Sequence, residues 1–184
     1  MKSKKIREFL RQHLKTHASN VHEEFDGDIS LYTMTREIEE VPEHIIGSVI
    51  WFLDEGEQIM VETLYSNTMS TLCEEHSENH LKLMRLFNII NSTVWFNTLY
   101  TPRICMAEDN FYQICLVTRI PYRFFETAPF ESADYITDFC PSLLEVLSSY
   151  ISGVLTGRLS VEDCIEYLEE LFSFADEGLT RFTL

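Results

Sequence analysis

The sequence predicts an α+β fold in which helices pack on one face of a twisted antiparallel sheet. The apolar pattern runs in the order helix, three strands, helix, three strands, helices. Short turns join the consecutive strands, and strands joined in this way pair antiparallel. A chain of 184 residues with 45% hydrophobic content also suits a single core. We therefore expect one domain over residues 1–184.

Residues 3–18 predict an amphipathic helix, because Ile6, Leu10 and Leu14 recur at helical spacing with charges between them. The first fifteen residues carry a formal charge of +5 and the remainder −21. The basic residues responsible are Lys2, Lys4, Lys5, Arg7, Arg11 and Lys15. Residues 1–20 therefore form a basic leading helix, which docks either on the acidic body of its own domain or elsewhere.

Three strands are expected next, after a turn at residues 25–28. Residues 29–38 alternate between apolar and polar side chains, as a half-buried strand does. Residues 44–53 and 58–65 are β-branched and aromatic runs, and the loop between them contains Gly56. This arrangement predicts a hairpin.

A helix and three further strands follow. Apolar residues from Leu72 to Phe87 lie in a segment without Gly or Pro, which predicts a helix running to about Asn88. The strands are expected at residues 93–100, 103–107 and 111–119, the last two joined by a turn at 108–110.

The last third of the chain predicts helices. Residues 131–155 carry apolar side chains at helical spacing, and Pro141 should kink or split that helix. Ser160 and Asp163 have the spacing of a capping box, with a final helix after them. Its acidic residues should form a solvent face opposite the apolar stripe or, alternatively, dock a basic segment; they are Glu162, Asp163, Glu166, Glu169 and Glu170.

Three stretches resemble the YbjN family, together with the order of elements over residues 20–172. They are residues 88–92 (NIINS), 138–144 (DFCPSLL) and 155–165 (LTGRLSVEDCI). The resemblance implies the fold of type III secretion chaperones. It also implies a small acidic protein, often dimeric, that acts as a chaperone-like or regulatory binder without known catalytic residues.

Charge and composition exclude several functions. A formal net charge of −16 repels phosphate backbones, so we expect no nucleic-acid binding and favour a basic partner. The chain contains no apolar run of the roughly 18 residues that span a bilayer, and residues 1–15 lack the apolar centre of a signal peptide. Its five cysteines are irregularly spaced, which favours a reducing cytoplasm over a disulfide framework.

Catalytic and metal-binding patterns are weak. His76 and His80 are four residues apart and could share one face of a helix, so a metal-assisted hydrolase is the alternative function. Cys105 and Cys115 lie in strand-like runs, where we expect buried apolar roles and not reactive thiols. No phosphate-binding or nucleophile motif occurs, so we expect no cofactor and no enzyme activity.

Adjacent aromatic residues in two of the strands are the candidate binding residues. Neighbouring side chains of a strand point to opposite faces, so each pair places one aromatic ring on each face of the sheet. If helices cover only one face, the other is left for a homodimer contact or for an extended client segment. The expected function is therefore a non-enzymatic chaperone-like or regulatory binder, with a structural adaptor as a further alternative. The candidate residues are Trp51, Phe52, Trp95 and Phe96.

Overall fold

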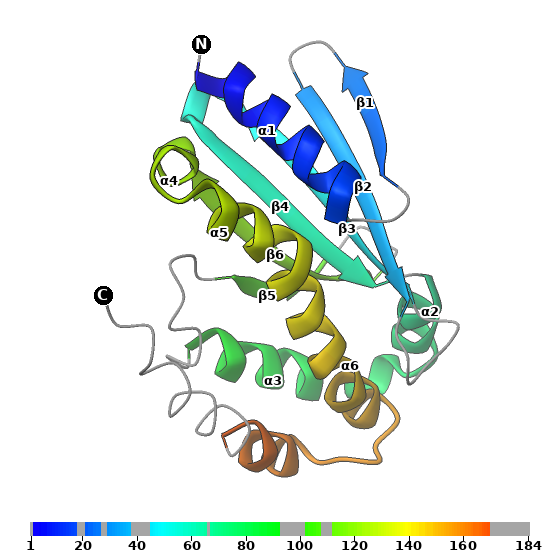
Figure 1. The fold of residues 1–184 in the computed structure, drawn as a ribbon. Coiled ribbons are helices and arrows are strands. Elements are labelled where there is room, and N and C mark those ends of the chain that lie inside the picture. The colour runs from blue at the N-terminus through cyan, green and yellow to red at the C-terminus, as the bar shows by residue number, and fades with distance from the viewer. Residues whose placement is uncertain are drawn as a thin grey trace.

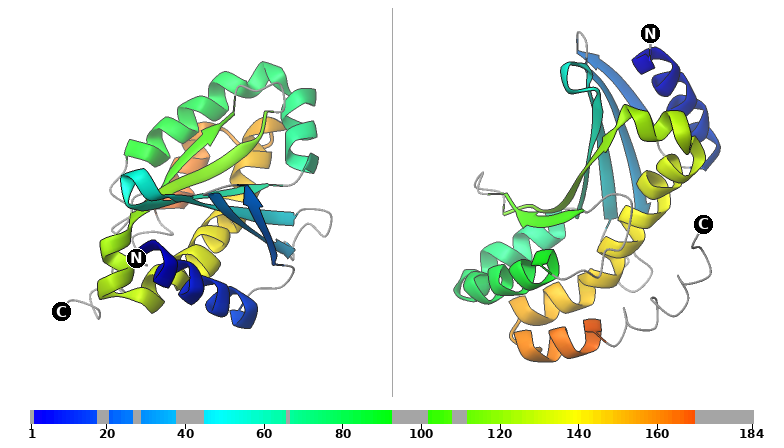
Figure 2. Two further views of the ribbon diagram at one scale, coloured as in Figure 1. Left: turned by 90° about the horizontal axis from the view of Figure 1, so that it is seen from above. Right: turned by 90° about the vertical axis from the view of Figure 1, so that its left-hand side faces the viewer.

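The computed structural model describes residues 2–17, 21–26, 29–37, 45–65, 67–92, 102–107 and 112–169. An open antiparallel sheet is covered on one face by helices (Figure 1), which confirms the α+β class. The views in Figure 2 place α1, α4, α5 and α6 along the same face, with α3 at the end of the sheet formed by β5.

The elements have the following bounds. The helices are α1 (Lys2–His17), α2 (Asn67–Glu75), α3 (His80–Ser92), α4 (Tyr122–Thr127), α5 (Pro129–Asp134) and α6 (Cys140–Leu155), with short turns η1 (Asp54–Gly56), η2 (Ser77–Asn79) and η3 (Tyr135–Phe139). A last helical segment covers residues 161–169. The strands are β1 (His22–Asp26), β2 (Ile29–Glu37), β3 (Ile45–Leu53), β4 (Gln58–Tyr65), β5 (Arg103–Met106) and β6 (Ile114–Pro121).

The strand order is β1-β2-β3-β4-β6-β5, with every described pair antiparallel. The strands expected at 29–38, 44–53, 58–65, 103–107 and 111–119 are confirmed, with end shifts of up to three residues. The strand expected at residues 93–100 lies outside the described residues.

The expected turn at residues 25–28 is partly wrong, because β1 covers His22–Asp26. This segment contains no β-branched residue, so its intrinsic strand propensity is low. It becomes a strand because its backbone pairs with β2, from Asp26 opposite Ile29 to His22 opposite Thr33. In this pairing β1 becomes the strand at one edge of the sheet.

Alternate residues of the central strands form the core beneath the helices. Their side chains are buried while those between them are partly exposed, as the two-residue period of a strand requires. The buried set is Ile46, Ser48, Ile50 and Phe52 of β3, Ile59, Val61, Thr63 and Tyr65 of β4, and Ile114, Leu116, Thr118 and Ile120 of β6. Ser48 and Thr63 lie opposite each other in this layer and satisfy one another through a 3.0 Å hydrogen bond between their hydroxyls.

The basic helix α1 docks on its own domain. Ile6, Leu10 and Leu14 are buried in the core, as their helical spacing predicts. On the same side of α1, the Arg7 guanidinium donates to Oδ2 of Asp54 in η1 at 2.8 Å. The sequence left open whether the basic helix docks on its own domain or elsewhere, and the structure shows that α1 packs on its own sheet.

Asp54 also joins α1 to the start of α4, because its carboxylate accepts a hydrogen bond from the Tyr122 hydroxyl. Partial burial pushes the pKa of the Asp54 carboxyl upward. Hydrogen bonds from Tyr122, Ser3 and Arg7, with the Arg7 charge, outweigh this and leave the pKa below its usual value. The ionised carboxylate is therefore the form that this contact stabilises.

The helix expected from about Leu72 to Asn88 is in fact two helices. α2 ends at Glu75, a 3₁₀ turn follows, and α3 starts at His80. The break turns Asn79 inward, where its Nδ2 donates to the carbonyl of Leu155 at 2.8 Å. That carbonyl is at the C-terminal end of α6, where helix carbonyls lack a partner within the helix.

Replacing Asn79 with alanine should lower the free energy of unfolding by about 1–3 kcal/mol, because the Leu155 carbonyl loses its side-chain donor in a buried place. Urea denaturation followed by circular dichroism measures this change. Asn88→Ala is the matched control: Asn88 is exposed on α3, so the expected change is within about 0.5 kcal/mol. Equal effects of the two substitutions would contradict the capping role of Asn79.

Pro141 interrupts the long helix, as expected. The π-helical turn η3 ends at Phe139, directly before α6, and the Cys140 N–H bonds to the Tyr135 carbonyl. Proline has no N–H, and its ring clashes with the carbonyl four residues earlier, so the wider turn relieves both problems.

The capping box at Ser160 is also confirmed. The Asp163 N–H donates to Oγ of Ser160 at 3.0 Å, and the Ser160 N–H donates to the Asp163 carboxylate at 3.1 Å. The Ser160 hydroxyl and N–H together lower the pKa of the Asp163 carboxyl. Two residues three positions apart thus fix where the helical segment 161–169 begins.

The outer edge of β5 is occupied by a side chain of α3. Asn91 donates from Nδ2 to the Ile104 carbonyl at 2.8 Å and accepts the Ile104 N–H at Oδ1 at 2.9 Å. One amide thus takes the place of a neighbouring strand at this position. Covering an edge in this way blocks strand addition by another chain and holds β5 in place.

Candidate functional site

The face of the sheet opposite the helices is the candidate functional surface. Within the described ranges, no helix packs on it (Figure 2), and its side chains on β3 and β4 are partly exposed. We call it the open face; it consists of Val49, Trp51, Leu53, Met60, Glu62, Leu64, Arg103, Cys105, Cys115, Val117 and Arg119.

The strand register arranges the open face in rows across the sheet. Trp51 lies opposite Met60, which lies opposite Arg119. In the next row, Val49, Glu62, Val117 and Arg103 follow one another, and in the third, Leu64, Cys115 and Cys105. Among the side chains that the structure describes, this surface is therefore mainly apolar, with one carboxylate between apolar neighbours and two arginines towards β5.

The adjacent aromatics of β3 point to opposite faces, as predicted. Trp51 lies on the open face, whereas Phe52 is only 2% exposed on the other side. The Arg7 guanidinium lies 4.2 Å from the centroid of the Phe52 ring. The assignment of Phe52 to a partner surface is therefore wrong, because its own core and α1 enclose it. Trp95 and Phe96 lie outside the described residues.

The expectation that Cys105 and Cys115 are buried is wrong. They face each other directly across β5 and β6, Cys105 is exposed and Cys115 partly exposed, and their Sγ atoms are 3.4 Å apart. Both fall on the open face because they alternate with the buried Ile104, Ile114 and Leu116. Both cysteines lie in apolar runs of the sequence, but alternate residues of a strand face opposite ways. The pairing register, which the sequence does not show, therefore decides which face each cysteine occupies.

A hydrogen bond joins the two thiols, in which either sulfur can be the donor, and this contact lowers the pKa of Cys105 to about 7. Desolvation and the negative charge of Glu62 act against this shift and are outweighed. The thiolate of Cys105 is therefore substantially populated at neutral pH.

The other cysteines have the opposite character. Cys73, Cys140 and Cys164 are buried in the core. Burial raises the pKa of Cys73 and of Cys140 to about 12, and that of Cys164 to about 11. These three remain protonated at neutral pH and act as small apolar side chains.

His76 and His80 do not share a helical face, because the helix expected there breaks at residues 76–79. The His80 Nε2 lies 2.7 Å from the Cys73 carbonyl oxygen, and its ring packs against Tyr112. His76 lies instead beside Glu78, with Nδ1 3.5 Å from the carboxylate. Over the part of the chain that is described, no three His, Cys, Asp or Glu side chains gather as metal ligands would. The geometry gives the metal-assisted hydrolase no support.

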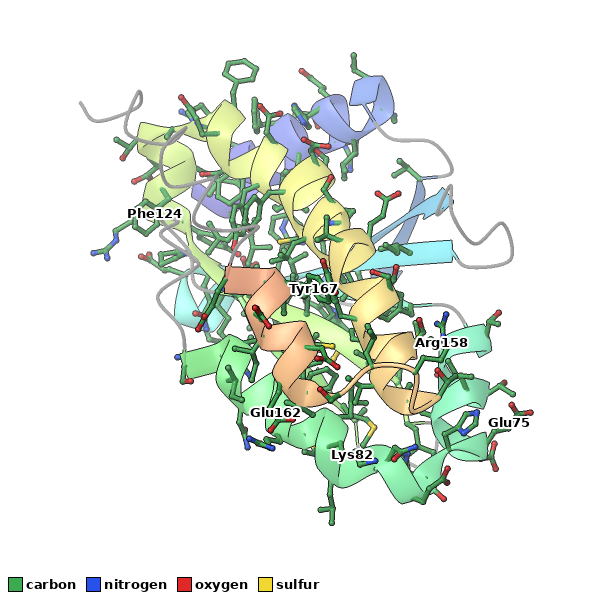
Figure 3. All side chains as sticks on the ribbon, turned by 90° about the horizontal axis from the view of Figure 1, so that it is seen from below. Glu75, Lys82, Phe124, Arg158, Glu162 and Tyr167 are labelled. Atoms are coloured by element: carbon green, nitrogen blue, oxygen red, sulfur yellow. The ribbon has the colours of Figure 1, made fainter. Side chains whose placement is uncertain are left out.

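The acidic residues of segment 161–169 form a solvent face, as predicted for Glu162, Asp163, Glu166 and Glu169; Glu170 lies outside the described residues. Cys164 and Leu168 are buried on the other side of the segment. Glu162, labelled in Figure 3, pairs with Arg85 of α3 at 2.6 Å. Both side chains remain largely exposed. This face is therefore a solvated surface with one exposed cross-helix ion pair.

Comparison of the chain with protein-family models, with curated proteins and with solved structures gave no match. The likeness to the YbjN family therefore stays a prediction. Among the described helices, none combines the length and apolar character needed to cross a bilayer.

Proposed function

We propose that the protein is a non-enzymatic, chaperone-like or regulatory domain that binds an extended, basic segment of a protein partner on its open face. The architecture that we infer for it is the one that the YbjN resemblance implies, that of a type III secretion chaperone. A cytoplasmic location belongs to the same proposal and is supported by five irregularly spaced cysteines.

The observation that carries the proposal is that all the described helices that pack on a face of the sheet pack on the same one. The helices bury Ile50, Phe52 and Ile59 on one face, whereas Trp51 and Met60 remain partly exposed on the other. A contiguous apolar surface of this kind on a folded domain usually marks a contact with another molecule. Tryptophan is also the residue type most enriched among those that dominate binding energy.

The charge of the chain favours a basic partner. The formal net charge is −16, and the connection between β3 and β4 places Glu55 and Glu57 at exposed positions, beside Asp54, whose carboxylate already binds Arg7. Glu62 adds a carboxylate within the open face itself. An extended segment that alternates apolar side chains with Lys or Arg matches this surface, because its apolar side chains would lie on the sheet while its cations meet the acidic rim.

Trp51→Ala should weaken binding of such a segment by about 2 kcal/mol or more, roughly 30-fold, because a central aromatic contact is lost. Fluorescence anisotropy measures the affinity with two labelled ten-residue peptides. Apolar residues alternate with Lys in the first peptide and with Glu in the second. The protein should bind the Lys peptide and not the Glu peptide.

Val146→Ala is the matched control, since Val146 is an exposed apolar residue on α6, on the helical side of the molecule. It should leave peptide affinity unchanged. Light scattering on the same samples tests self-association: a dimer that Trp51→Ala converts to monomer would assign the open face to a second copy instead. Equal affinity of the Lys and Glu peptides, or no effect of Trp51→Ala on affinity or on mass, would refute the proposal.

A further inference from the structure

We propose that Cys105 and Cys115 form a thiol–disulfide exchange site that reacts with low-molecular-weight disulfides such as oxidised glutathione. This chemistry is separate from protein binding and does not depend on it. It would make the pair a reversible covalent modification site at the β5 end of the open face.

Geometry favours a bond between the two sulfurs. Cys105 and Cys115 are direct partners in the β5–β6 register, and their Sγ atoms are 3.4 Å apart. Directly opposite residues of antiparallel strands have Cα atoms about 4.5–5.5 Å apart, which lies within the range of about 4.4–6.8 Å that disulfides use. Rotation of the side chains can therefore bring the sulfurs to bonding distance without separating the strands.

The surroundings hold this geometry. β6 is paired with β4 on its other side, and Asn91 bonds both backbone groups of Ile104, the residue before Cys105. Both strands are thus anchored on the side away from the cysteine pair. A fixed distance between two thiols favours the intramolecular bond over reaction with a second protein molecule.

Access and reactivity distinguish the two sulfurs. Cys105 is exposed on the edge strand, and its pKa of about 7 makes it the attacking thiolate at neutral pH. Cys115 is less exposed and is placed to attack second. Among the charged side chains that the structure describes on this face, Glu62 and Arg103 lie opposite Val117, in the row next to the pair.

The exchange balances in two steps. The Cys105 thiolate attacks one sulfur of oxidised glutathione, the glutathione S–S bond breaks, and one glutathione thiolate leaves. The Cys115 thiol then loses its proton and attacks Sγ of Cys105, and the second glutathione leaves. The two protein thiols lose two electrons to the glutathione disulfide, and their two protons end on the two glutathione thiols.

The test treats the folded full chain with oxidised glutathione at pH 7, blocks remaining thiols with an alkylating reagent, and maps the products by mass spectrometry. We expect a Cys105–Cys115 disulfide in the unmodified sequence. Cys115→Ser should instead accumulate glutathione on Cys105, because the second step is lost. Cys105→Ser should form a mixed disulfide with oxidised glutathione at least tenfold more slowly than Cys115→Ser.

Cys73, Cys140 and Cys164 serve as internal controls, since they are buried and should be recovered alkylated only after unfolding. Circular dichroism checks that both serine variants fold, which is expected because both positions lie on the open face and not in the core. Equal reaction rates of the two variants would overturn the proposal. So would a folded protein that keeps both thiols reduced in excess oxidised glutathione, or a disulfide that involves a buried cysteine.

Discussion

Replacing Phe52 with alanine is expected to lower the free energy of unfolding by about 3–5 kcal/mol. The Phe52 side chain is 2% exposed, its ring lies 6.5 Å from that of Tyr122, and the Arg7 guanidinium covers it at 4.2 Å. Removing the ring leaves a cavity between β3 and α1 and deprives Arg7 of its aromatic contact. Urea denaturation followed by circular dichroism measures the loss.

Trp51→Ala is the control for Phe52→Ala, because the two residues are neighbours on one strand and face opposite ways. Trp51 is partly exposed, so Trp51→Ala should lower the free energy of unfolding less than Phe52→Ala does. Trp51→Ala, in contrast, is the substitution expected to weaken peptide binding. The two substitutions thus separate the two faces of the sheet. If Trp51→Ala were the more destabilising of the two, the open face would be part of the folded core.

A second large effect is expected in α6. Leu147 is fully buried in the helix that packs on β3, β4 and α3, so Leu147→Ala should cost about 2–5 kcal/mol of unfolding free energy. Val146→Ala, one position earlier, should change it by no more than about 0.5 kcal/mol, because Val146 is 41% exposed. Comparable losses at the two positions would mean that α6 presents a different face to the sheet.

The sequence predicted those elements whose signal is local. The strand at residues 58–65 has the expected bounds because its buried and partly exposed residues alternate without interruption. The start of the segment 161–169 followed from the Ser160–Asp163 pair, since a capping box involves only residues three apart. The apolar stripe of α1 likewise identified Ile6, Leu10 and Leu14 as core residues.

Features that depend on distant partners were not predictable from the sequence. The segment of β1 has weak strand propensity and is a strand because β2 pairs with it. The break between α2 and α3 is held by Asn79, whose partner carbonyl at Leu155 is 76 positions away. No local pattern marks such a contact.

Only part of the candidate surface was predictable, because the rest depends on contacts between distant parts of the chain. The alternation of a strand predicted that Trp51 and Phe52 would point apart, but which of them faces the helices depends on where α1 and α4 pack. The pairing of Cys105 with Cys115 required the register of β5 against β6, which the turn between them did not reveal.

Because β6 pairs with β4, the sheet cannot be completed until the ribosome has synthesised β6. On the ribosome β1–β4 can pair as soon as Tyr65 has emerged, whereas β6 ends at Pro121 and α6 only at Leu155. At about 5–20 residues per second, translation from Tyr65 to Pro121 takes roughly 3–11 s. During that interval, α1 is the one described helix of the covered face that has already been synthesised. Of these helices, α1 alone can then cover Phe52 and its neighbours in the nascent chain.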